Sequence, residues 1–140
     1  MNSKVIVAAL LGALTSFILG FICYGLLLMD YMSTNMIPGA MKTEAEMGAS
    51  SYVFIFLGSF ASSLLFAYVF DRWANIRTAR GGASAGALLG LLMILSFDFG
   101  MYATTNLLKM NFMLLDIALN VVFAAAAGAV IGWWLGRKPA

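Results

Sequence analysis

Four long stretches of apolar residues dominate the hydrophobic pattern, and each is long enough to cross a lipid bilayer. They run over about 5–29, 52–70, 83–106 and 113–135. A helix needs about 20 apolar residues to cross about 30 Å of hydrocarbon. Backbone groups must be paired inside a bilayer, and the polar alternation of a barrel strand is absent from this sequence. The pattern therefore predicts an all-α bundle of four transmembrane helices, with residues 1–140 as a single membrane domain.

The composition supports a membrane protein and argues against a soluble one. Hydrophobic residues make up 63% of the chain and charged residues 10%, against about 25% charged residues in soluble domains. A chain of 140 residues could not bury that much apolar surface in water. We therefore expect the lipid bilayer as a partner. A net charge of +2, with no run of Lys or Arg, argues against nucleic acid as a partner.

The distribution of basic residues predicts the orientation in the membrane. One side holds Lys4, Arg72, Arg77, Arg80, Arg137 and Lys138, and the other holds Lys42 and Lys109. Cytoplasmic loops are enriched in Lys and Arg, and Trp favours the membrane interface. All three Trp residues (Trp73, Trp133 and Trp134) fall on the first side. We therefore expect cytoplasmic termini in a multi-pass protein of the inner (plasma) membrane.

Small residues spaced four apart occur on every span. Helices in lipid associate largely through close backbone approach, which small residues permit. We expect helix packing at Gly12, Gly20, Gly58, Gly82, Gly86, Gly90, Gly128 and Gly132. The ladders of the third and fourth spans lie in the same half of the membrane, so these two spans should touch there. Because Gly and Ala are common in membrane helices, chance is the alternative explanation for part of this pattern.

The two halves of the chain share a short similarity. Residues 12–14 (GAL) precede 31–35 (YMSTN), and residues 86–88 (GAL) precede 102–106 (YATTN). Such a repeat is typical of two tandem helical hairpins. Short matches of this kind also arise by chance, so both explanations stay open.

One polar residue from each span falls about 10 Å below the outer helix ends, at about 1.5 Å per residue. These residues are Tyr24, Ser59, Asp98 and Asn120. An ionisable residue inside a span is costly and by default indicates function. The pattern predicts a polar layer that binds a cation, a proton or a small polar solute. Two alternatives stay open for Asp98: a wet position beyond an early end of the third span at Phe97, or a neutral carboxyl group bonded to Asn120.

Methionine gathers at the outer side, where eight of the ten occur. They are Met29, Met32, Met36, Met41, Met47, Met101, Met110 and Met113. Thioether sulfur binds Cu(I), but Met also suits irregular or partner-binding surfaces, which is the interpretation we favour. With no His and one Cys, we expect no metal site and no cofactor. The outer connection, 30–51, is broken at Pro38 and Gly39, and its second half is expected as a short surface helix or a solvated connector.

Segments near both ends resemble a known family. Residues 20–25 (GFICYG) are similar to the Gly-x-x-Trp-Tyr stretch of a widespread family of small bacterial four-helix membrane proteins, known only as a domain of unknown function. Cys23 stands at the Trp position. Residues 102–108 and 114–116, followed by a Gly- and Ala-rich last span, also resemble that family. The resemblance implies a fold and a membrane location and brings no activity with it.

Two classes of function follow from these observations. The first is a structural or accessory subunit, associated with its own copies or with other membrane proteins in an oligomeric complex. The second is a small transporter or channel that uses Asp98 and Asn120. An enzyme is not expected, because the carboxylates, Lys109 and the Tyr residues form no recognisable catalytic motif.

Overall fold

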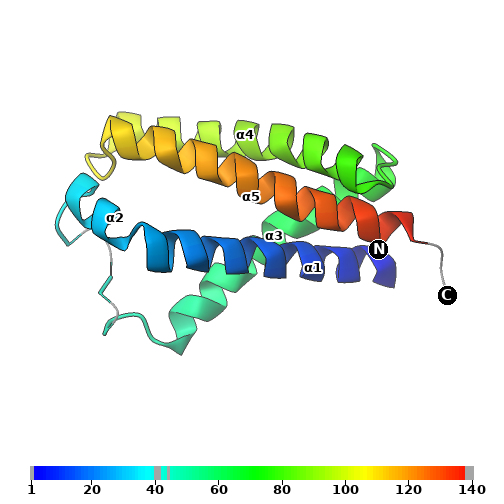
Figure 1. Ribbon diagram of the computed structural model, residues 1–140, viewed down its shortest axis with the longest axis horizontal. Coiled ribbons are helices and arrows are strands. Elements are labelled where there is room, and N and C mark those ends of the chain that lie inside the picture. Colours follow the sequence, from blue (N-terminus) through cyan, green and yellow to red (C-terminus); the bar gives the residue numbers. More distant parts are fainter. Residues whose placement is uncertain (1, 40–41, 44, 138–140) are drawn as a thin grey trace.

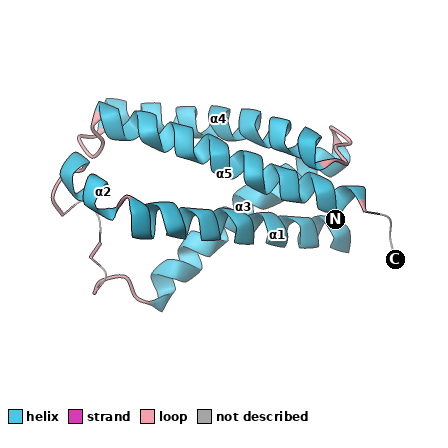
Figure 2. Ribbon diagram, in the orientation of Figure 1, coloured by secondary structure: helices cyan, strands magenta, loops and turns pink. Residues whose placement is uncertain are grey.

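The computed structural model describes residues 2–39, 42–43 and 45–137, and this part of the chain is helical without strands. Its elements are α1 (Ser3–Gly20), a π-helical segment η1 (Phe21–Leu27), α2 (Met29–Asn35), α3 (Ala49–Arg72), α4 (Ala79–Thr104) and α5 (Met110–Gly136). Figures 1 and 2 show these helices joined by short loops and by one longer connection between α2 and α3.

Four helical segments are long and apolar enough to cross a membrane: α1 with η1, then α3, α4 and α5. They contain 24 to 27 residues, or about 36–40 Å of helix. The fold predicted from the sequence is therefore confirmed, and the protein is a membrane protein. The first span ends at Leu27, slightly earlier than expected, because the chain breaks at Leu28 and begins the separate helix α2.

The helices pair in chain order, and the two pairs meet along α1 and α5. Helix α1 packs against α3, α4 packs against α5, and α1 also contacts α5. Both ends of the described chain lie at the same end of the molecule (Figure 1), as the orientation argument requires. Helix α3 diverges from the other helices toward the opposite end (Figure 1) and barely contacts α4. The arrangement is that of two helical hairpins.

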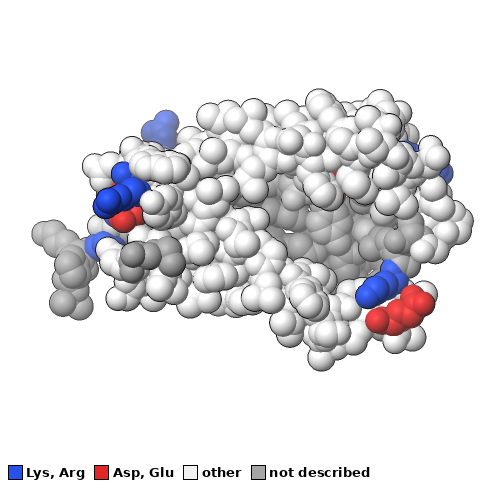
Figure 3. All heavy atoms as spheres, turned by 180° about the vertical axis from the view of Figure 1, so that it is seen from behind, with Lys and Arg blue, Asp and Glu red and all other residues white. Residues whose placement is uncertain are grey.

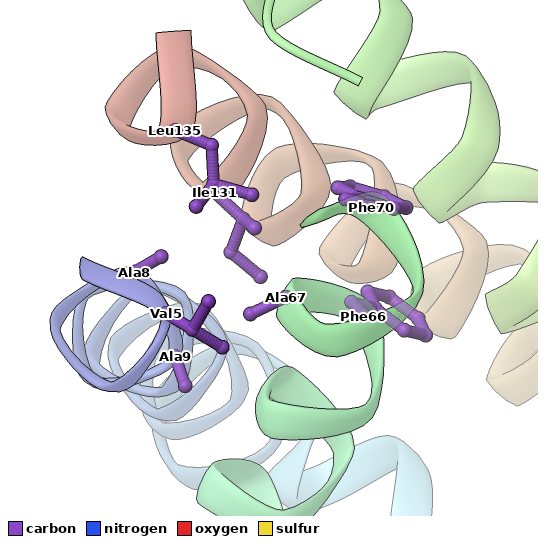
Figure 4. Packing of buried hydrophobic residues seen from close by; sticks show 8 residues of the cluster. All are labelled: Val5, Ala8, Ala9, Phe66, Ala67, Phe70, Ile131 and Leu135. Atoms are coloured by element: carbon purple, nitrogen blue, oxygen red, sulfur yellow. The ribbon is translucent and has the colours of Figure 1, made fainter. Parts of the chain in front are cut away.

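The hydrophobic core lies near the two termini, where α1, α3 and α5 meet. Its buried members are Val5, Ala8, Ala9, Phe66, Ala67, Phe70, Ile131 and Leu135. Figure 4 shows the Ile131 side chain pointing toward Ala67 of α3 and Val5 of α1, whereas the rings of Phe66 and Phe70 point away from α1. Because the alanines on α1 and α3 are small, the three helices can pack closely around the larger side chains of the core. This end of the molecule is therefore the tightly packed one.

Glycines bring the backbones of α4 and α5 into direct contact. A Cβ atom at Gly86 would overlap the carbonyl oxygen of Ala124, and one at Gly128 would overlap that of Gly82. Gly90 and Gly132 are equally close to the facing helix, and Gly12 of α1 lies against Ile131. The expected contact between the third and fourth spans is confirmed.

Two of the predicted packing glycines do not pack. Around Gly20 and Gly58, an added Cβ would meet no atom within 4 Å. The prediction for these two positions is wrong because α1 and α3 separate beyond their core, so that Gly58 is exposed and Gly20 borders open space. Spacing alone could not reveal where the two helices diverge.

Polar contacts hold the connections at both ends. Arg77 bonds Asp71 at 2.7 Å and the carbonyl oxygen of Leu135 at 3.4 Å, which joins the turn between α3 and α4 to the end of α5. At the opposite end, Lys109 Nζ donates to the carbonyl oxygen of Thr34 at 2.9 Å.

A short surface helix was one of the two structures considered for residues 40–49. The described residues of this stretch that precede Ala49 instead form turns or irregular backbone. Lys138 and Met41, used in the sequence argument, lie outside the described residues.

The glycine contact gives a direct test of the packing. We expect Gly86→Ala to lower the free energy of unfolding by about 1–3 kcal/mol, because overpacking at a tight contact forces the backbones apart. Gly58→Ala is the matched control, since its side chain would point into open space, and it should leave stability unchanged or raise it slightly. Thermal unfolding in detergent, followed by circular dichroism, measures both. Equal stabilities of the two variants would contradict the packing described here.

Candidate functional site in the membrane

A π-helical turn at the end of the first span positions Tyr24. The chain changes from α-helix to π-helix at Phe21, and the amide N–H of Leu28 bonds the carbonyl oxygen of Cys23, five residues earlier, at 2.8 Å. π-Helical turns are rare and occur frequently at functional sites. The Tyr24 ring packs edge-on against Phe123 of α5, with 5.9 Å between ring centroids. The hydroxyl group is thereby brought to α5, between the outer ends of the helices.

Tyr24, Asp116 and Asn120 form one hydrogen-bonded group. The Tyr24 hydroxyl donates to Asp116 Oδ1 at 2.6 Å. Asn120 Nδ2 donates to Asp116 Oδ2 at 3.1 Å and to the Tyr24 oxygen at 3.2 Å. Both carboxyl oxygens of Asp116 therefore accept a hydrogen bond from a neutral donor. Asp116 and Asn120 lie four residues apart on α5, so they share one face of the helix.

Asp98 of α4 completes this group, which we call the polar cluster (Tyr24, Asp98, Asp116 and Asn120). Its carboxyl group lies next to that of Asp116, close enough for the two acids to interact. The residue is 1% exposed, and its Oδ2 atom accepts no hydrogen bond from the described residues. It follows Gly82, Gly86 and Gly90 on the buried face of α4, at multiples of four residues. The face that brings the helices together therefore carries Asp98 to α5.

A large hollow adjoins the polar cluster. One part, of about 970 Å³, opens between α3 and α4, and a second part, of about 890 Å³, lies under α2 and the connection that follows it. Ser16, Ser59, Asn120 and Phe123 border both parts, and Tyr24 borders the second. Figure 3 shows the back of the molecule hollowed between its two ends, with the charged side chains gathered at those ends. Tyr24 and Asn120 thus stand between the hollow and the two carboxyl groups.

The structure brings together three of the four residues predicted for the polar layer. Tyr24, Asp98 and Asn120 belong to the polar cluster, whereas Ser59 does not: its hydroxyl group bonds the carbonyl oxygen of Ile55 at 3.1 Å. Ser59 instead borders the hollow, because α3 diverges from the bundle.

Both alternatives considered for Asp98 are wrong in their details. Helix α4 continues to Thr104 and buries Asp98, so the residue does not lie at a wet interface. The Asn120 amide donates to Tyr24 and Asp116, and no hydrogen bond between Asp98 and Asn120 is found among the described residues. Asp116 was not among the four residues predicted for the polar layer. The four-residue spacing of Asp116 and Asn120 places both on one face of a helix, and this spacing could have indicated that Asp116 belongs with Asn120.

The described residues show no group of three or more His, Cys, Asp or Glu side chains arranged to hold a metal ion. Met29, Met32, Met36 and Met47 border the hollow under α2, and their sulfur atoms contribute to an apolar wall. The connection between α2 and α3 also borders this part of the hollow, from Met36 to Met47, and covers it beside Tyr24.

Fold and site together define a small four-span membrane protein with a polar cluster inside its bundle. A family model described as "Protein of unknown function (DUF1761)" matches residues 7–132, and the chain belongs to this family. The match confirms the resemblance drawn from the segments around Tyr24 and Asp116. No curated protein and no solved structure matches the chain.

The hydroxyl group of Tyr24 should contribute measurably to stability. We expect Tyr24→Phe to lower the free energy of unfolding by about 1–3 kcal/mol, because it removes the donor to Asp116 and leaves a partly buried acceptor unpaired. Tyr102→Phe, at an exposed tyrosine of α4, is the matched control and should have little effect. Denaturation in mixed micelles provides the measurement. A Tyr24→Phe variant as stable as the control would show that the hydrogen bond to Asp116 does not support the fold.

Proposed function

We propose that the protein is a small transporter that binds a cation or a proton at the polar cluster. One observation carries it: Asp98 is 1% exposed and its Oδ2 atom accepts no hydrogen bond from the described residues, next to the hydrogen-bonded group of Tyr24, Asp116 and Asn120. The ion pair found among the described residues joins Arg77 to Asp71 at the other end of the bundle. The polar cluster itself contains two acids and no basic side chain.

The depth of these acids supports a functional role. Asp98 lies six residues before the end of α4 and Asp116 six residues after the start of α5, which is about 9 Å from each helix end. A charged residue in a span costs about 2.5–3.5 kcal/mol on insertion scales, and such residues mark ion or proton pathways. Two carboxyl groups side by side favour a positively charged ligand. A cation or a proton therefore fits better than a neutral solute.

The hollow reaches Asn120 between α3 and α4, and its second part gives access to Tyr24 and Asn120 from the α2 end of the bundle. It borders Tyr24 and Asn120 beneath α2, whereas the hydrophobic core fills the space between α1, α3 and α5 toward the termini. A bound ion would reach the polar cluster from the α2 end. Passage onward requires a rearrangement of the helices, so the arrangement supports a transporter more than an open channel.

One chain supplies every member of the polar cluster, which supports a function that does not need a partner. The glycine ladders of α4 and α5 contact each other within the chain, so they are not free to bind another protein. The accessory-subunit hypothesis would have to use a different surface.

Ion flux into liposomes tests the proposed function. Purified protein is reconstituted, and gradients of H⁺, Na⁺ and K⁺ are imposed one at a time while fluorescent dyes report the ion inside. We expect flux of at least one of these ions above that of protein-free liposomes. Asp98→Asn should abolish this flux, because the amide keeps the shape of the side chain and removes its ionisable group.

Asp30→Asn is the matched control, since Asp30 is exposed on α2 and lies outside the polar cluster. It should leave flux unchanged. Equal flux in the wild type and in Asp98→Asn would remove Asp98 from the transport path. No flux of any of the three ions in the wild type would refute the proposal and favour the accessory-subunit hypothesis.

A further inference from the structure

We propose that Asp98 and Asp116 share one proton and that the ion carried by this protein is H⁺. This inference rests on the proposed function, and it names the ligand of the same site. It is drawn from the direction of the hydrogen bonds in the polar cluster and from the buried oxygen that they leave without a donor.

The hydrogen bonds assign different states to the two acids. Asp116 accepts from the Tyr24 hydroxyl at Oδ1 and from the Asn120 amide at Oδ2, an arrangement that stabilises an ionised carboxylate. The carboxyl groups of Asp98 and Asp116 also lie next to each other, and two adjacent acids without a basic partner resist ionising together, so that one of them holds a proton. Asp98, whose buried Oδ2 receives no donor, is therefore the acid that holds the proton.

The same geometry argues against a metal cation between the two acids. A cation such as Na⁺ is bound by several oxygen lone pairs, and one lone pair on each carboxyl oxygen of Asp116 already accepts from an O–H or an N–H group, which leaves fewer for a metal ion. The other titratable groups near the pair are Tyr24 and Cys23 of η1. The pair itself consists of one acid on α4 and one on α5. None of these groups is a base that would form an ion pair with the second carboxylate. A shared proton reduces the charge of the two acids from −2 to −1.

Tyr24 connects the pair to the hollow. Its oxygen accepts from Asn120 and its hydroxyl group donates to Asp116, and Tyr24 also borders the hollow under α2. When the hydroxyl proton passes to Asp116 Oδ1, a proton from hydronium in the hollow replaces it on the Tyr24 oxygen. The exchange transfers one proton and leaves a water molecule behind, and all other covalent bonds are unchanged.

Infrared difference spectroscopy detects the shared proton directly. The protein is studied in a maltoside detergent, which contains no carbonyl group, in H₂O and in D₂O at neutral pH. We expect a C=O band of a protonated carboxylic acid in the wild type, with a shift on deuteration. Asp98→Asn and Asp116→Asn should each remove this band, because the proton belongs to the pair, whereas Asp30→Asn should retain it.

The liposome assay completes the test with a readout that the spectrum does not provide. We expect flux of H⁺ but not of Na⁺ or K⁺, and slower H⁺ flux in Tyr24→Phe than in Tyr102→Phe. The absence of the carboxylic acid band, or a band that survives in both Asn variants, would overturn the shared proton. Flux of Na⁺ or K⁺ without H⁺ flux would overturn the inference that H⁺ is the carried ion and would leave the proposed function standing. The band without any ion flux would support the shared proton and refute transport.

Discussion

The backbone contact between α4 and α5 is the constraint on which the rest of this molecule depends. In lipid, helices gain little from apolar burial against each other, so close packing of small residues has to bring them together. Gly82, Gly86 and Gly128 allow a separation that any larger side chain would prevent. Two antiparallel helices in contact keep one register along their length. The register that the glycines set at one end therefore places Asp98 beside Asp116 at the other, and a slip of one turn, about 5.4 Å, would separate them.

The bundle divides into a packed end and an open end. Near the termini, α1, α3 and α5 bury a continuous apolar core, and this part holds the helices in place. Toward α2 the helix α3 diverges, which opens the hollow beside Tyr24 and Asn120. Sites that bind or release ligands lie in loosely packed regions, because such regions can rearrange without disrupting the core. The position of the polar cluster at the open end follows this rule.

The change from α-helix to π-helix at Phe21 links the first span to the site. A π-helical turn contains more residues than an α-helical one, and it changes the direction in which the following side chains point. Here it presents Tyr24 to Asp116 of a helix 92 residues further along the chain. No single residue type marks such a turn, so it was not visible in the hydrophobic pattern. The family resemblance drew attention to the segment without indicating its geometry.

The sequence by itself determined the four spans, the common end for both termini and the ladders that join α4 to α5, because length, apolarity and residue size fix these properties locally. It also gave Tyr24, Asp98 and Asn120 as neighbours in depth. It did not reveal that Asp116 is the centre of the polar cluster. It also did not reveal that Ser59 and Gly58 lie outside the contacts between helices. Depth along a helix is a local quantity, but the direction in which each residue faces depends on helix rotation and on the divergence of α3. Only the packing of all four spans decides these.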